Sequence, residues 1–126
     1  MKTPLSLLAI VCCFFYTCKK KVYQTGEASY YADFFHGKKT ASGEIFNMHA
    51  MTAAHRKLPF RTTIKVCNLA NDKCVKVRIN DRGPRKDIKA KDGTPRILDL
   101  SLGAAQKLEM IDSGVTQVEI TILSKG

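Results

Sequence analysis

Cys74-Val-Lys-Val-Arg-Ile-Asn-Asp-Arg-Gly-Pro84 is the segment around which the rest of the chain can be arranged. Its first half alternates apolar and polar side chains, which is typical of a half-buried strand. Its second half is a polar turn, in which Gly83 allows unusual backbone angles and Pro84 ends strand pairing. The pattern predicts a strand that holds the carboxylate of Asp81 at its end, where a rigid scaffold can position a catalytic group. A turn-capping role for Asp81 is the alternative.

The run before this segment, residues 62–68, also alternates like a strand, and residues 69–73 suit a hairpin turn. If the apolar residues of both strands share one face, Cys67 lies opposite Cys74 on the other face. This register predicts a cross-strand disulfide in an oxidising compartment. A metal pair or two free thiols are the alternatives. The sequence has neither the CxxC spacing nor the clustered histidines of a metal site, so we expect none.

Residues 1–17 have the features of an export signal, because Lys2 is followed by an apolar run that ends at Tyr16. The run is shorter than the roughly 20 apolar residues of a transmembrane helix. It is followed by Cys18, which resembles the lipidation cysteine of bacterial lipoproteins; ordinary cleavage and an uncleaved anchor are the alternatives. Residues 18–25 are expected to form a polar tether, and residues 26–124 a globular domain.

The net charge of the chain is +10, from 21 basic and 11 acidic residues, which favours an anionic partner. Nucleic acid, an anionic membrane surface and an acidic cell-wall polymer all fit this charge. No zinc-finger, ribonucleoprotein or helix-turn-helix signature is present, so we do not expect nucleic acid to be the partner.

The remaining patterns indicate a mainly β protein. Residues 26–32 and 96–100 are strand-like, and a last strand carries the alternating apolar residues of the segment 118–122. Residues 51–59 are expected to be a short helical turn or a loop, ended by Pro59. A helix is expected to begin after Ser101, a good N-cap residue. Several short strands with few helices predict a small β-barrel.

Four side chains are candidates for chemistry: Glu44, His55, Asp81 and Asp99. A carboxylic acid can protonate a leaving oxygen when burial or a neighbouring charge raises its pKa, and a histidine can orient the proton. Two of them have structural alternatives here: His55 can bond local backbone, and Asp99 can stabilise the start of a helix. The chain has no nucleophile elbow, phosphate loop, dinucleotide fingerprint or zinc-protease motif.

Five blocks of sequence occur in a characteristic order. They are Gly26-Glu-Ala-Ser-Tyr-Tyr31, Phe35-His-Gly-Lys-Lys-Thr-Ala-Ser-Gly-Glu44, Met51-Thr-Ala-Ala-His-Arg-Lys-Leu-Pro59, Arg78-Ile-Asn-Asp-Arg-Gly-Pro84 and Ile97-Leu-Asp-Leu-Ser101. Together they resemble the rare lipoprotein A family of bacteria over roughly residues 26–123. The resemblance implies a six-stranded double-psi β-barrel with short helices. It also implies a lytic transglycosylase that cleaves the bond between N-acetylmuramic acid and N-acetylglucosamine in peptidoglycan.

The resemblance implies three catalytic residues: Asp81 as the catalytic carboxylate, His55 as the histidine of the Ala-Ala-His block, and Glu44 as a supporting glutamate. Asp99 matches an acidic position that related barrels use in catalysis. As substrate-binding residues we expect Asp99, Arg82, Asn80 and Tyr31. On this hypothesis Asp81 donates a proton to the glycosidic oxygen and then accepts the proton of the attacking muramyl 6-hydroxyl, which leaves a 1,6-anhydromuramyl end. No cofactor is expected.

Two departures from the family pattern lie beside the expected groove. Arg85 stands where an aromatic residue usually follows Gly-Pro, and the charged segment 86–95 is longer than usual. Both are expected to affect substrate preference. The protein is expected to be a monomer in the cell envelope, anchored by lipid to a bacterial membrane and facing the periplasm. A non-catalytic, expansin-like module that binds wall glycan is the alternative function.

Overall fold

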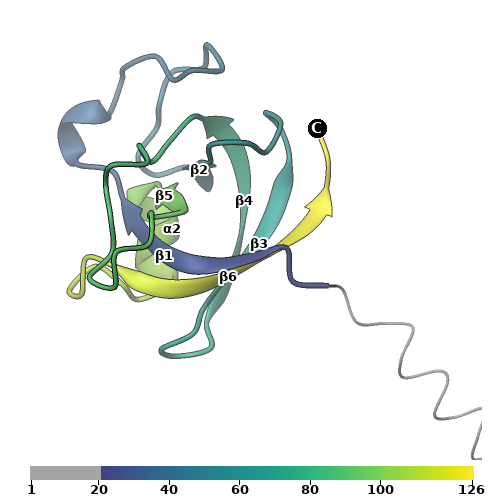
Figure 1. Ribbon diagram of the computed structural model, residues 1–126. Helices are drawn as coiled ribbons and strands as arrows, with labels where there is room; N and C mark the ends of the chain where they lie inside the picture. Colours follow the sequence, from purple (N-terminus) through teal and green to yellow (C-terminus); the bar gives the residue numbers. More distant parts are fainter. Residues whose placement is uncertain (1–20) are drawn as a thin grey trace, which may run out of the picture.

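A computed structural model describes residues 21–126 (Figure 1). The expected export signal and Cys18 lie outside the described residues. Six strands close into a barrel in the order β1-β5-β2-β4-β3-β6, so the mainly β barrel expected from the sequence is confirmed. The elements are β1 (Gln24–Tyr30), η1 (Asp33–Phe35), β2 (Thr52–Ala54), β3 (Thr63–Asn68), β4 (Cys74–Asp81), β5 (Leu98–Leu100), α2 (Leu102–Lys107) and β6 (Thr116–Ser124).

Parallel and antiparallel pairs combine in this barrel. β1 pairs with β5 and β2 with β4 in parallel, and the other neighbours are antiparallel. In Figure 1 the β3–β4 hairpin lies at the bottom, whereas β4 ends at the top, near the long loop that follows β1. The polar turn after β4 and the β3–β4 hairpin are therefore at opposite ends of the barrel.

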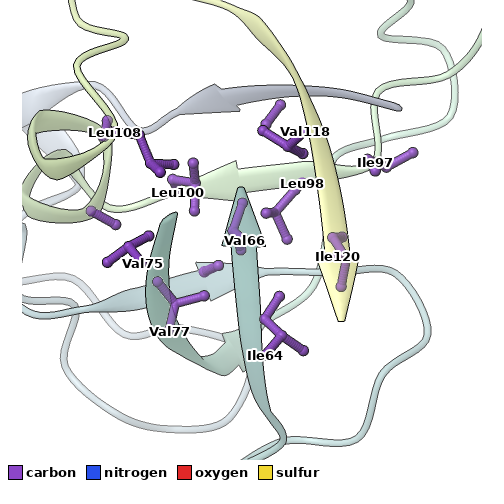
Figure 2. Close-up of a cluster of buried hydrophobic side chains, with 14 of the residues drawn as sticks. Ile64, Val66, Val75, Val77, Ile97, Leu98, Leu100, Leu108, Val118 and Ile120 are labelled. Atoms are coloured by element: carbon purple, nitrogen blue, oxygen red, sulfur yellow. The ribbon is translucent and has the colours of Figure 1, made fainter. Parts of the chain in front are cut away.

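Aliphatic side chains from the strands fill the barrel interior, and α2 closes one side (Figure 2). Ile64 and Val66 from β3 pack with Val77 from β4, and all three are almost fully buried. The alternation that the sequence showed in these strands thus places one face of each strand in the core. Burial of each such side chain contributes about 1.5–3 kcal/mol, which makes the barrel a rigid support for its loops.

The expectation for residues 51–59 was wrong in part, because Thr52–Ala54 form strand β2 instead of a helical turn or loop. All three residues are buried between β4 on one side and β5 on the other. Small side chains fit this enclosed position, but they carry no alternation of apolar and polar residues. Strand formation here is imposed by the neighbouring strands and not by local preference.

Two local predictions are confirmed. The Ser101 hydroxyl accepts a hydrogen bond from the Ala104 N–H, as expected of an N-cap at the start of α2. Cys67 lies directly opposite Cys74 in the β3–β4 register, and a disulfide joins them in the structure. Within residues 21–126 no helix is both long and apolar enough to cross a membrane.

Candidate active site

The end of β4 supplies the central carboxylate of the site. The carbonyl oxygen of Asp81 accepts a hydrogen bond from the His55 N–H, which ties this strand end to the segment after β2. The next residues turn away from the sheet, and Gly83 has φ 133°, a conformation that favours glycine. Asp81 is therefore held by the barrel while its side chain faces the loops above.

Three donors hold the carboxylate of Asp81 in one orientation. Oδ2 accepts from the Tyr31 hydroxyl at 2.5 Å, and Oδ1 accepts from the N–H groups of Ala41 at 2.8 Å and Arg82 at 2.9 Å. Burial and the bond to Asp81 raise the pKa of Tyr31 well above its ordinary value, so the phenol remains a donor. Such an arrangement pre-organises the group and limits its movement during a reaction.

A second carboxyl group shares the pocket with Asp81. The pocket has a volume of about 280 Å³, and both Asp81 and Asp99 line it. Asp99 lies on β5 opposite Ser29 of β1, whose hydroxyl donates to Asp99 Oδ1 at 2.5 Å. Burial raises the pKa of Asp99; the negative charge of Asp81 adds to this shift, while Ser29 and two arginines oppose it.

The remaining walls of this pocket are mostly aromatic or belong to the turn after β4. They are formed by Tyr30, Tyr31, Ala32, Phe35, Arg82, Gly83, Pro84 and Arg85. Two carboxyl groups with different surroundings in one pocket are a recurring arrangement for acid–base chemistry. Asp99, whose pKa is raised, can carry a proton, and Asp81 is held in a fixed orientation in the same pocket.

His55 does not line the carboxyl pocket. Its ring lies in an adjacent hollow of about 330 Å³, lined by Tyr23, Gln24, His55, Arg56, Lys57 and Lys86. Nε2 donates to Gln24 Oε1 at 2.8 Å, and Nδ1 accepts from the N–H groups of Lys57 and Leu58, both at 3.0 Å. Burial, with the positive charges of Arg56, Arg82 and Lys57, lowers the pKa of His55 to about 4. The ring is thus neutral and fixes the loop after β2.

Glu44 lies in a third hollow, of about 460 Å³, together with Ser42, Phe60, Arg61 and Arg78. Its carboxylate pairs with Arg78 at 2.5 Å, and this bond lowers the pKa of Glu44. The Glu44 loop reaches the central site through its backbone, because Ala41 donates to Asp81 and Ser42 donates to the Asn80 carbonyl. Glu44 is therefore suited to hold its loop and to accept hydrogen bonds, and not to donate a proton.

The expected substrate-binding residues have different fates. Tyr31 and Asp99 line the carboxyl pocket, and so does Arg82, whose guanidinium lies 4.0 Å from the centre of the Phe60 ring. Arg82 also donates to the carbonyl oxygens of His55 and Leu58, so it links the loop after β2 to the pocket. Asn80 is only 3% exposed and lines none of these three hollows, which argues against the expected contact with substrate.

Three contributors were missed at the level of sequence. Ser29 binds Asp99, Gln24 binds the His55 ring and Arg78 pairs with Glu44. Each contact joins segments far apart in the chain, so no local pattern reveals it. Among residues 21–126 no three His, Cys, Asp or Glu side chains are grouped in a way that could hold a metal ion.

Comparison with known proteins gives consistent results. A family model described as lytic transglycolase matches residues 23–120. The chain is 48% identical over 101 residues to an endolytic peptidoglycan transglycosylase RlpA of Campylobacter jejuni, covering 80% of this chain and 34% of that protein. A probable RlpA of Treponema pallidum is 53% identical over 95 residues, covering 75% and 28%. The Neisseria meningitidis RlpA is 44% identical over 114 residues, covering 88% and 45%. The chain thus spans about a third of the length of several relatives.

Two solved structures share the fold. The Streptomyces papain inhibitor superposes with a TM-score of 0.55 at 22% identity, covering 84% of this chain and all of that one. The apo expansin of Clavibacter michiganensis superposes with a TM-score of 0.57 at 18% identity, covering 81% of this chain and 50% of that one. At these identities the likeness concerns the fold alone, and it agrees with the expected double-psi β-barrel.

Proposed function

Because this chain belongs to the RlpA family of lytic transglycolase domains, we propose that it is an endolytic lytic transglycosylase of peptidoglycan. Its reaction would be that of a lyase, because the glycosidic bond between N-acetylmuramic acid and N-acetylglucosamine is cleaved without water. The observation that carries the proposal is the pocket at the end of β4, where Asp81 and Asp99 lie together in different environments. The names of the relatives support the substrate class.

The two carboxyl groups divide the proton transfers between them. The hypothesis from sequence gave both transfers to Asp81, but the pocket offers a second group. Asp99 has a raised pKa and is the better proton donor to the oxygen that leaves from the muramyl anomeric carbon. Three fixed donors hold Asp81 in one orientation in the same pocket, and in this scheme it takes the proton of the attacking hydroxyl.

In the proposed step, Asp99 protonates the glycosidic oxygen while the bond between that oxygen and the anomeric carbon breaks. The muramyl 6-hydroxyl attacks the same carbon, and Asp81 takes its proton. The products are a 1,6-anhydromuramyl end and a free hydroxyl on N-acetylglucosamine. Return of the proton from Asp81 to Asp99 restores the site. An intramolecular attack of this kind can lower the barrier by about 7–11 kcal/mol when the geometry is good.

His55 and Glu44 act as positioning residues in this scheme. His55 fixes the loop whose backbone N–H binds the Asp81 carbonyl. Glu44, paired with Arg78, fixes the loop whose Ala41 N–H binds the Asp81 carboxylate. Removal of either side chain is expected to reduce turnover by disturbing the orientation of Asp81.

We also propose that the protein is exported and anchored by lipid at Cys18, facing the periplasm of a bacterial envelope. The support comes from the sequence alone: an apolar run that follows Lys2 and precedes a cysteine. The net charge of +10 would favour contact with an acidic wall polymer.

Mass spectrometry of digested, peptide-free glycan strands tests the reaction directly. New 1,6-anhydromuramyl ends are expected. New reducing ends would mean hydrolysis by water and would overturn the lyase mechanism. Binding of the strands with no new ends would instead favour the expansin-like alternative, a module that holds glycan without cutting it.

A further inference from the structure

Two adjacent phenylalanines stand exposed beside the carboxyl pocket. Phe34 is 63% exposed and Phe35 is 39% exposed, at the end of the short helix η1. Their ring centres are 4.1 Å apart. Exposure of apolar side chains to water is unfavourable, and such residues grouped beside a cleft often mark a contact surface. We call Phe34 and Phe35 the aromatic ledge.

The aromatic ledge continues into the carboxyl pocket without a break. Phe35 itself lines the pocket, and its ring meets the Tyr31 ring edge-to-face at 5.4 Å. Tyr31 in turn stacks on Phe46 at 4.6 Å and donates its hydroxyl to Asp81. A ligand that reaches Asp81 therefore has an aromatic surface beside it, held in place by a chain of ring contacts.

Backbone hydrogen bonds tie this ledge to neighbouring residues. The Phe35 N–H donates to the Ala32 carbonyl, and the Lys38 N–H donates to the Phe35 carbonyl. The Gly37 N–H donates to the Phe46 carbonyl, which joins the loop after η1 to Phe46. An aromatic surface whose backbone is already held by such bonds loses less conformational freedom when it binds a ligand, and so it can contribute to affinity.

We propose that the aromatic ledge is a sugar-binding subsite, on which one residue of the glycan strand stacks beside the bond that is cut. This inference rests on the proposed function and extends it, because the apolar C–H face of a pyranose ring packs well on an aromatic ring. The Lys38 ammonium lies over the Phe34 ring, 4.5 Å from its centre, and brings a positive charge to the ledge. The ledge thus fits a sugar that carries a carboxylate, as muramyl residues do.

The absence of tryptophan from the sequence provides a direct probe. In an Asp81→Asn background, which prevents cleavage, Phe34→Trp places a single tryptophan on the ledge. Leu69→Trp is the matched control, because Leu69 is 42% exposed but lies in the β3–β4 hairpin at the other end of the barrel. Titration with peptide-free glycan strands is expected to give a saturable change in fluorescence in the Phe34→Trp variant and none in the Leu69→Trp variant.

Kinetics give a second readout. In the otherwise wild-type protein, Phe34→Ala and Phe35→Ala are expected to raise KM for glycan strands by about tenfold with a smaller change in kcat, and Leu69→Ala is expected to leave both unchanged. One outcome would refute the subsite and leave the proposed function standing. In that outcome the parent protein makes anhydromuramyl ends, the alanine variants have the KM of the parent, and the fluorescence of Phe34→Trp does not change on titration. If the fluorescence of Phe34→Trp responds but the parent makes no new ends, the subsite stands and the proposed reaction fails.

Two further outcomes would overturn the subsite. Unchanged fluorescence together with no sedimentation of the protein with glycan strands would exclude glycan binding altogether. A fluorescence change in Phe34→Trp with anionic lipid vesicles and none with glycan would make the ledge a membrane contact.

Discussion

Acidification should destabilise this protein through His55. In the folded chain both ring nitrogens have partners, and Nδ1 accepts two backbone N–H groups. A proton on Nδ1 would face these donors and break both hydrogen bonds. The positive charges of Arg56 and Lys57 would also repel the protonated ring. The pKa of His55 is about 4 in the fold, against 6.5 for an ordinary histidine.

The sign and the size of the effect follow from these two values. Above pH 6.5 the histidine is neutral in both states and the full stability is present. As the pH falls from 6.5 to about 4, the unfolded chain binds a proton that the folded chain does not, so stability is lost. The difference of about 2.5 between the two pKa values corresponds to at most about 3.4 kcal/mol, and screening by nearby solvent reduces our expectation to about 2 kcal/mol.

Urea unfolding at pH 7.5 and at pH 4.5 measures this difference. The wild type is expected to lose about 2 kcal/mol more than His55→Gln between the two conditions, because other groups titrate equally in both proteins. His49→Gln, at an exposed histidine, provides the comparison. If the wild type and His55→Gln lost the same free energy of unfolding between the two pH values, His55 would not be enclosed and neutral in the fold. Its positioning role would then be refuted.

Three further predictions concern other residues. The limb of the pH–rate profile that falls at high pH should report the raised pKa of Asp99. Asp99→Asn should reduce turnover at least 100-fold, as expected when a general acid is lost. An unchanged rate in this variant would assign the proton donation to Asp81. Cys67 and Cys74 should appear linked in non-reducing peptide maps. Replacing either cysteine should lower the free energy of unfolding by about 2–4 kcal/mol. Alkylation of both cysteines without reductant would reject the disulfide. Cys18→Ser should release the protein from the membrane fraction, whereas unchanged partition with no acyl group on the N-terminal peptide would favour an uncleaved anchor.

The fold was predictable where apolar and polar residues alternate along the chain. β3 and β4 carry clear apolar faces, so their hairpin and the register of Cys67 with Cys74 could be derived locally. β2 could not, because Thr52–Ala54 are small residues buried on every side and owe their strand geometry to β4 and β5. In such a barrel the nonlocal pairs decide which segments become strands.

The candidate site divides in the same way. Asp81 could be placed at a strand end because the strand and its turn are contiguous in sequence. Its sharing of a pocket with Asp99 could not be derived, because it depends on how β5 is placed beside β1 and β2. The enclosed ring of His55 likewise depends on Gln24, which lies 31 residues earlier in the chain.

The number of anhydromuramyl ends released by Asp81→Asn tests the central claim most directly. The substitution keeps the size of the side chain and part of its hydrogen bonding, but the amide cannot take the proton of the attacking hydroxyl. Asp112→Asn, at an exposed aspartate in the turn before β6, serves as the matched control. The account predicts that Asp81→Asn stays folded and binds glycan strands, yet releases at least 100-fold fewer anhydromuramyl ends than the wild type and Asp112→Asn. Release of such ends by Asp81→Asn at the wild-type rate would contradict it.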